Sequence, residues 1–320
     1  MNEATPDKDA VPAPPGPSAP SVPSVPRIRP VRQEDKSTVL AFCEHTFECG
    51  DYIKYVFDEW LSGGGDFLAA ELDGRAVGIV HVAYLGRGDQ AWFEGLRVDP
   101  AYRGRGVARA LARAEVEAAR RRGCRVARCM VFGNNAGGHA VSRIAGLQPV
   151  ARQAHLLWRP KAGGSDLASA GPPRLVVVPN DASDVARAGE LMRRAACNRG
   201  PDGTPGLLCD WGWQDVAPDS LARLAERGQL LTTDAWDALA AFDVWHQEVE
   251  AFLNAGDAAA AARLGAAAMR FAVDRSYTEL AVIVPDDAAY RNALQGVGFE
   301  PPGVSSGHPG TYVVYEMRVG

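Results

Sequence analysis

Residues 91–123 read AWFEGLRVDPAYRGRGVARALARAEVEAARRRG, and this stretch decides the fold that we expect. Ala91–Val98 has the composition of a strand, and the pair Asp99-Pro100 ends it. Apolar side chains recur at helical spacing through Val107–Arg122, and Gly123 is well suited to end a helix. We therefore predict a strand that turns through a short loop directly into a long helix.

The loop between this strand and helix has the features of an anion site. Its small residues let the backbone approach a ligand closely, and its two arginines bring positive charge. The first N–H groups of the helix have no partner within it, and the helix dipole adds to their attraction for anions. The residues predicted to bind a pyrophosphate are Arg103, Gly104, Arg105, Gly106, Val107 and Ala108.

Two other phosphate-binding loops fit this sequence less well. A P-loop requires a lysine, and the loop at 103–108 contains none. A dinucleotide-binding loop requires a small third residue for close packing of helix and strand, and Arg109 stands at that position.

The pattern Arg-x-x-Gly-x-Ala at 103–108 resembles the central motif of the GNAT superfamily of N-acetyltransferases, Gln/Arg-x-x-Gly-x-Gly/Ala. The resemblance covers about residues 27–158 and implies an α/β fold, a mixed sheet with helices on both faces. In this family the loop holds the pyrophosphate of acetyl-CoA, the acyl donor. The preceding strand pairs with the pantetheine arm, which implies that the backbone of Leu96, Arg97 and Val98 lines that arm.

A later helix, predicted at about residues 137–145, carries one match to the family and one departure from it. The family places an asparagine that contacts CoA at the start of this helix, and Asn135 matches it. Many relatives then have a tyrosine that protonates the leaving thiolate, whereas this sequence has Ser142. A serine hydroxyl is too weak an acid for that role, so water or a tyrosine from elsewhere in the chain would have to replace it.

Acyl transfer to an amine requires a base, because an alkylamine with a pKa near ~10 is protonated at neutral pH and cannot attack the thioester. Glu94 is the candidate: family members often carry a base at this place on the strand, and the neighbouring Trp92 and Phe93 could desolvate it. The alternatives are that Glu94 is an exposed carboxylate or that it pairs with Arg97.

A longer phrase, from Glu94 to Ala108, and the segment 49–61 look like a subgroup of the family similar to the histidine N-acetyltransferases. Histidine is accordingly one candidate among small amines and amino acids. The family builds its acceptor site in the helical region that contains the predicted helix 52–61, which implies substrate contacts for Asp51 and Tyr52. A helix N-cap is an equally good role for Asp51.

The remaining reactive side chains are interpreted as structural. Direct transfer needs no covalent intermediate, so Cys124 and Cys129 are core thiols, and His81 and His139 are structural or surface histidines. No set of histidine, cysteine and carboxylate residues has the spacing of metal ligands, so no metal is predicted.

Two parts of the chain resemble each other, which indicates an ancient duplication. The first opens PRIRPVRQEDKSTV at Pro26 and the second opens PRLVVVPNDASDVA at Pro173. Chance similarity between alanine-rich segments is the alternative. The predicted parts are a disordered Pro-rich tail (1–26), a catalytic GNAT domain that binds acetyl-CoA (27–160), a linker (161–172) and a second GNAT-like domain (173–320).

The second part lacks the anion site. Asp257 falls where the first part has Arg105, and an acid at this helix start would repel a pyrophosphate. We therefore predict a degenerate copy of the fold that binds no CoA, with a helix at 258–273 and a final strand at 311–317.

Composition sets the outer limits. The 320 residues are 47% hydrophobic and 23% charged, which fits two globular domains, and a net charge of −5 disfavours a nucleic-acid binder. The sequence contains no run of 18 apolar residues, so we predict no membrane span. The six cysteines form no CxxC pair, which indicates reduced thiols and a cytoplasmic protein. The oligomeric state stays open.

The predicted function is transfer of an acetyl group from acetyl-CoA to a small amine or amino acid, by direct attack of the neutral amine on the thioester. Two alternatives stay open. One is the same chemistry on a protein N-terminus or lysine, and the other is a regulatory module that binds acyl-CoA without catalysis.

Overall fold

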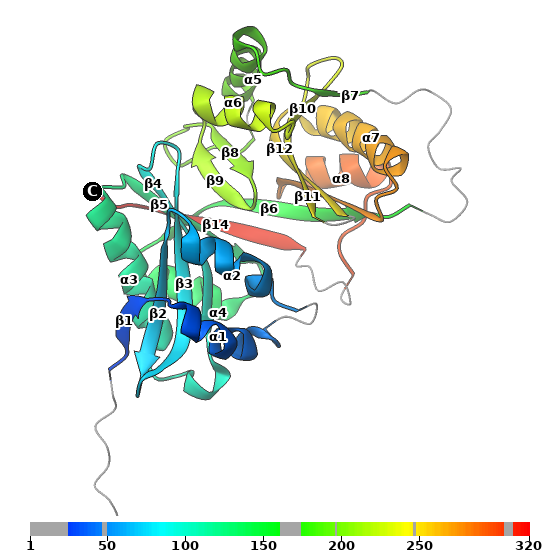
Figure 1. Ribbon diagram of the computed structural model, residues 1–320. Coiled ribbons are helices and arrows are strands. Elements are labelled where there is room, and N and C mark those ends of the chain that lie inside the picture. Colours follow the sequence, from blue (N-terminus) through cyan, green and yellow to red (C-terminus); the bar gives the residue numbers. More distant parts are fainter. Residues whose placement is uncertain (1–24, 47–49, 161–173, 196, 246–247, 304–309) are drawn as a thin grey trace, which may run out of the picture.

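The computed structural model describes residues 25–46, 50–160, 174–195, 197–245, 248–303 and 310–320. The predicted linker and nearly all of the predicted tail lie outside these residues. Two lobes follow each other along the chain, and in each of them helices pack against a sheet (Figure 1).

The elements of the two halves run in a similar order. Those of the first half are β1 Arg27–Pro30, η1 Gln33–Asp35, α1 Lys36–Cys43, α2 Ile53–Ser62, β2 Asp66–Leu72, β3 Arg75–Leu85, β4 Gln90–Val98, η2 Pro100–Tyr102, α3 Val107–Arg122, β5 Val126–Phe132, α4 Ala136–Ile144 and β6 Gln148–Trp158. Those of the second half are β7 Leu175–Val177, α5 Ala182–Arg194, β8 Gly206–Cys209, β9 Gly212–Asp215, α6 Pro218–Glu226, β10 Leu230–Thr233, β11 Leu239–Trp245, β12 Glu248–Ala255, α7 Ala258–Asp274, β13 Glu279–Pro285, α8 Ala288–Gly296 and β14 Thr311–Arg318.

Helix α3 has the predicted bounds, Val107–Arg122. A glycine in the left-handed region flanks each end, with φ of 81° at Gly106 and 80° at Gly123. Its apolar stripe, which includes Leu111 and Val116, is buried against the sheet. Glycine at both ends lets the chain enter and leave the helix sharply, and it leaves the N-terminal turn without a capping side chain.

One sheet of twelve strands extends through both halves, in the order β1-β2-β3-β4-β5-β14-β6-β13-β12-β11-β10-β7. Among the described residues its parallel pairs are β4 with β5 and β12 with β13, and the other pairs are antiparallel. The predicted mixed α/β sheet is therefore confirmed.

The two halves exchange their last strands. Strand β6 pairs with β13 of the second half, and β14 pairs with β5 of the first half. The two exchanged strands also pair with each other, side by side where the lobes meet (Figure 1). Each half thus completes the sheet of the other, which separate tandem domains would not do.

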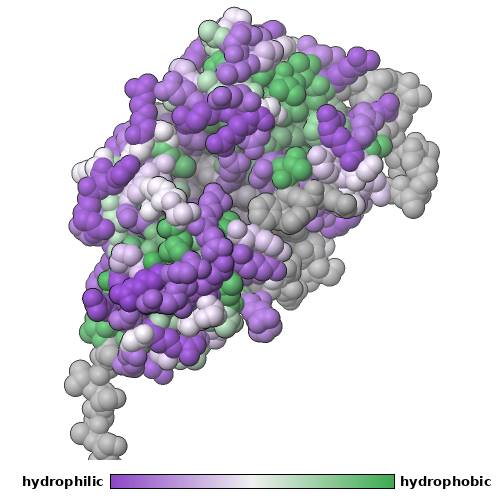
Figure 2. Space-filling model, in the orientation of Figure 1, coloured by the Kyte–Doolittle hydropathy of each residue, from purple (hydrophilic) through white to green (hydrophobic). Residues whose placement is uncertain are grey.

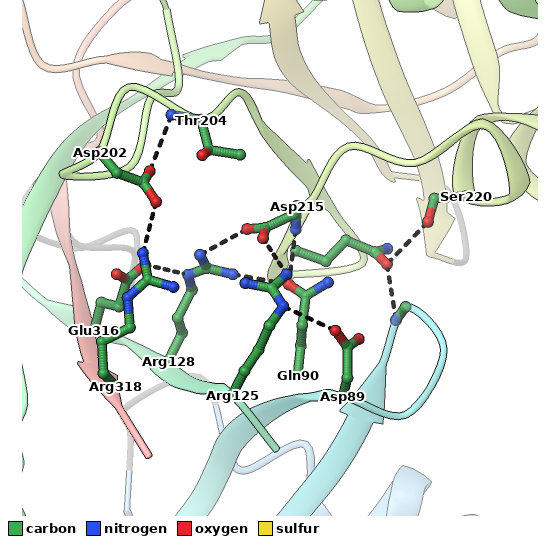
Figure 3. Close-up of polar contacts among 12 residues, drawn as sticks. Asp89, Gln90, Arg125, Arg128, Asp202, Thr204, Asp215, Ser220, Glu316 and Arg318 are labelled. Atoms are coloured by element: carbon green, nitrogen blue, oxygen red, sulfur yellow. Dashed lines mark hydrogen bonds and ion pairs between the residues drawn. The ribbon is translucent and has the colours of Figure 1, made fainter. Parts of the chain in front are cut away.

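A hairpin of the second half, β8–β9, is tied to the first half by a buried polar cluster (Figure 3). The Arg128 guanidinium of β5 donates to Glu316 on β14 at 2.7 Å, to Gln90 on β4 at 2.9 Å and to Asp215 on β9 at 2.7 Å. The Asp215 N–H in turn donates to Gln90 Oε1 at 2.8 Å. One buried arginine therefore joins strands from both halves of the chain.

Replacing Val314 with proline tests the exchange. Val314 is fully buried in the middle of β14, opposite Met130 of β5 and Ala151 of β6. Proline removes its N–H and strains a central strand, so we expect a loss of roughly 3 kcal/mol or more of unfolding free energy. Thermal unfolding followed by circular dichroism would show both halves melting together at a lower temperature.

Val314→Ala is the control, because it keeps the N–H and loses only two methyl groups. If Val314→Pro were no less stable than Val314→Ala, the pairing of β14 would not hold the halves together.

Candidate active site

Strands β4 and β5 diverge in the middle of the first half. They pair only over Gln90–Phe93 and Val126–Cys129, although β4 continues to Val98 and β5 to Phe132. On its other edge β4 stays paired with β3 as far as Val98. The backbone of β4 beyond Phe93 is thus held on one side and left unpaired by β5 on the other. Leu96, Arg97 and Val98, the predicted contacts of the pantetheine arm, lie along this edge.

The predicted phosphate loop lies directly after the diverging part of β4. Gly104 and Gly106 have φ of 76° and 81°, and a Cβ on either would meet no atom within 4 Å. Arg103 and Arg105 are exposed, and the Arg105 guanidinium lies 5.1 Å from the centre of the Tyr102 ring. No side chain caps the helix start at Val107 and Ala108. The loop is therefore open, positively charged and followed by an uncapped helix N-terminus.

The equivalent helix start in the second half is closed. The Asp257 carboxylate accepts the N–H of Ala260 at 2.8 Å, so an acidic cap occupies the N-terminus of α7. Beyond the last pair of β12 and β13, the Asn254 side chain bonds to both backbone groups of Leu208 on β8. These contacts support the expectation that the second half binds no CoA, which stays a prediction.

Glu94 lies immediately after the last residue pair of β4 and β5 and is a quarter exposed. Its Oε1 lies 2.7 Å from Nδ1 of His81, the residue opposite it on β3. Glu94 is therefore neither a freely exposed carboxylate nor dependent on Arg97 for a partner. Sequence reasoning assigned His81 to a structural role and missed this contact.

The Arg97 side chain forms an ion pair with Asp51. Its Nε donates to Oδ2 at 2.7 Å and its Nη2 to Oδ1 at 3.2 Å. The same Oδ1 accepts the N–H of Ile53 at 3.1 Å, but the N-cap position of α2 is held by Tyr52, so Asp51 supports the helix start from one residue before the cap. Whether Asp51 also contacts substrate stays a prediction.

Tyr52 lies beside this ion pair, partly exposed. The centre of its ring is 5.3 Å from the Arg97 guanidinium and 6.0 Å from the Trp60 ring. Desolvation raises the pKa of the Tyr52 phenol to about 12, although the charge of Arg97 acts in the opposite direction. The phenol is therefore neutral at pH 7 and able to donate a hydrogen bond.

Helix α4 places the last predicted residues. Asn135 caps it, with Oδ1 accepting the N–H of Gly138 at 2.9 Å. Ser142 is buried, and its hydroxyl donates to the Gly138 carbonyl at 3.0 Å and lies 3.4 Å from the Cys129 sulfur. These contacts give the Ser142 hydroxyl a packing role. Burial raises the pKa of the Cys129 thiol to about 12, which favours the core interpretation of that cysteine.

A hollow of the described surface lies away from these residues. A cavity of about 530 Å³ in the second half is lined by Arg227, Phe242, Phe271 and Arg275, among others. The hydrophobic patches of the upper lobe in Figure 2 also belong to the second half. The chemistry described above gathers instead at the divergence of β4 and β5.

Residues 35–146 match the model of the acetyltransferase (GNAT) family. This match covers less than half of the chain and spans β4, the predicted phosphate loop and α4. A comparison with curated proteins gives no match.

Solved structures of low sequence identity share the fold of nearly the whole chain. A GCN5-related N-acetyltransferase from Sphaerobacter thermophilus is 13% identical, with 92% of this chain and 96% of that chain covered and a TM-score of 0.60. A tandem GNAT protein from the clavulanic acid biosynthesis pathway is 14% identical, with 92% and 99% covered and a TM-score of 0.57. A GCN5-related N-acetyltransferase from Kribbella flavida is 16% identical, with 92% and 72% covered and a TM-score of 0.52. The predicted tandem GNAT-like fold is thereby confirmed.

Two features are absent from the described residues. None of the helices there is long and apolar enough to cross a membrane. Within the same residues, no group of three or more histidine, cysteine or acidic side chains is placed to hold a metal ion.

Replacing Asp51 with alanine tests the buried ion pair. The side chains of Asp51 and Arg97 are only 2% and 12% exposed. Loss of the carboxylate leaves a largely buried guanidinium uncompensated, which should cost about 3–5 kcal/mol of unfolding free energy. Urea denaturation measures this loss.

Asp58→Ala, on the helix α2 that follows Asp51, provides the control. Asp58 pairs with Lys36 at the surface, where its side chain is 66% exposed, so its removal should cost less than about 1 kcal/mol. Equal losses for the two variants would contradict a stabilising role of the Asp51–Arg97 pair.

Proposed function

We propose that this protein transfers the acetyl group of acetyl-CoA to the amine of a small molecule. The observation that carries the proposal is the continuous path from the uncapped start of α3, along the unpaired edge of β4, to Glu94. An anion site, a strand edge able to pair with an amide-containing arm and a carboxylate follow each other in the order that acetyl-CoA requires.

Each part of the path has a proposed role. The backbone at 103–108 and the Arg103 and Arg105 side chains bind the pyrophosphate, and Asn135 adds a contact with CoA. The backbone of 96–98 pairs with the pantetheine arm, and one of its N–H groups stabilises the oxyanion, which can contribute roughly 3 kcal/mol. Metal ions, nucleic acid and membranes have no part in the proposed reaction, and we expect it in the cytoplasm.

Glu94 is the proposed base. The protonated acceptor first loses a proton to the carboxylate. The neutral nitrogen then attacks the carbonyl carbon, the C–S bond breaks to release the CoA thiolate, and the second nitrogen proton passes to that thiolate through water. The thiolate requires little assistance, because a thiol with a pKa near ~8.5 is a moderate acid already. Water therefore suffices to protonate it, and Ser142 need not act.

A small acceptor is favoured by the contact between the halves. Along β4, Trp92 and Glu94 point to the same face, since side chains alternate along a strand. Trp92 packs in one core cluster with Cys209 and Trp213 of the hairpin β8–β9. The second half therefore borders the face of the sheet that carries Glu94. Helix α2 borders the same region through Trp60, which stacks on His81. These neighbours leave less room for a polypeptide acceptor. Histidine is one candidate among small amines, on the resemblance noted above.

Arg103→Glu tests the phosphate loop. Reversing this charge replaces a charge-assisted contact with repulsion, so the KM for acetyl-CoA should rise by about tenfold or more. Steady-state assays that follow the free thiol measure this. Arg113→Glu, at an exposed position of the helix α3 that follows the loop, should leave the KM unaltered. An unchanged KM in Arg103→Glu would show that the loop does not bind the pyrophosphate.

Glu94→Gln tests the base. The amide cannot accept the proton, so kcat should fall by about 10²-fold or more while acetyl-CoA binding persists. The assay uses a panel of amines that includes histidine, other amino acids and a peptide with a free N-terminus, and calorimetry measures the binding of acetyl-CoA.

Glu59→Gln, at an exposed position of α2, is the control. Binding without turnover of any amine by the unmodified protein would favour the regulatory module. Preferential turnover of the peptide would favour a protein acetyltransferase.

A further inference from the structure

His81 is held in a fixed orientation beside Glu94. Its side chain is buried, with only 5% of the residue exposed. The Trp60 ring stacks on the imidazole at 4.4 Å between centroids and 9° between planes, and Phe67 contacts it edge-on at 6.1 Å. The ring therefore has little freedom to turn away from the carboxylate.

Two glycines allow this arrangement. A Cβ on Gly65 would lie 2.4 Å from Nε2 of His81, and a Cβ on Gly95 would lie 2.5 Å from the Trp60 ring. Gly95 has φ of 67° and follows Glu94 in a stretch where the register of β3 and β4 shifts. Trp60 thus contacts both the imidazole and the backbone next to Glu94. Since His81 is hydrogen-bonded to Glu94, Trp60 supports this pair from both sides, at the imidazole and at Gly95.

The direction of this hydrogen bond follows from the chemistry of a base. An ionised carboxylate can only accept, so Nδ1 of His81 is the donor and Glu94 Oε1 the acceptor, 2.7 Å apart. The bond occupies Oε1 and leaves Oε2 as the atom that can take a proton from the acceptor.

We propose that His81 is a positioning residue for Glu94: its Nδ1–H holds Oε1 so that Oε2 faces the acceptor amine. This inference rests on the proposed function, in which Glu94 removes the proton. The imidazole exchanges no proton with substrate in this step. The proton moves from the acceptor nitrogen to Oε2, the lone pair that this frees forms the new bond to the carbonyl carbon, and the C–S bond breaks to release the CoA thiolate.

Two variants at position 81 separate the hydrogen bond from the packing. His81→Phe keeps a ring to stack on Trp60 and loses the donor, whereas His81→Asn keeps a donor near the position of Nδ1 and loses the ring. We expect kcat to fall by about 10–100-fold in His81→Phe, as for the loss of other orienting partners, with the KM for acetyl-CoA changed less than about twofold. His81→Asn should retain most of kcat.

A double variant gives a readout that packing alone would not change. Adding His81→Phe to Glu94→Gln should produce no further loss, since the partner is already gone.

Equal losses in His81→Phe and His81→Asn, both shown by thermal melting to be folded, would overturn the proposal, and so would an unchanged kcat in His81→Phe. If the unmodified protein acetylated no amine, the proposed function would fail separately. The ¹⁵N shifts of the His81 ring would then decide: a protonated Nδ1 whose signal changes in Glu94→Gln supports the hydrogen bond, and an unprotonated Nδ1 contradicts it.

Discussion

The backbone pairing of β14 is the constraint on which the rest of the molecule depends. Residues Tyr312–Arg318 pair with the whole of β5, while β5 pairs with β4 only as far as Cys129. Because β14 satisfies one edge of β5 along its full length, the strand can separate from β4 on the other edge and remain part of the sheet. The last strand of the chain therefore supports the opening in which the proposed cofactor lies.

The two halves use corresponding helix N-termini in different ways. Helices α3 and α7 occupy corresponding places, yet Gly106 precedes the first and Asp257 the second. An acidic or hydroxyl cap typically stabilises a helix by about 1 kcal/mol relative to a residue that cannot accept a hydrogen bond. The first half forgoes that stabilisation where an anion can take the place of the cap, and the second half keeps it. Stability and anion binding thus compete for the same N–H groups.

The strand–loop–helix unit could be predicted from the sequence because its signals are local. Apolar spacing and two flanking glycines define α3, and the arginines and small residues of the loop are contiguous. Glu94 belongs to the same contiguous stretch, so its place on β4 could be predicted from local signals too.

The long-range arrangement could not be predicted in this way. His81 and Glu94 are thirteen residues apart, and they face each other only through the register of β3 and β4, which shifts nearby. A shift of one residue would have turned one of the two side chains to the opposite face of the sheet. The insertion of β14 depends likewise on pairing between segments that are far apart in the sequence, for which no local pattern exists. No local pattern marks Arg128 either, because its partners Asp215 and Glu316 lie on β9 and β14.

The contrast between Ser142 and Glu94 is explained by the two proton transfers that the proposed reaction requires. At pH 7, removing a proton from an amine with a pKa near ~10 costs about 4 kcal/mol, whereas protonating a thiolate with a conjugate pKa near ~8.5 is already favourable. Assistance is therefore needed mainly at the amine. The structure agrees with this asymmetry: Ser142 is engaged by the Gly138 carbonyl, while Glu94 is supported by a buried, stacked histidine. In the proposed reaction, a firmly oriented base assists the difficult proton transfer, and the easy one needs no tyrosine acid at position 142.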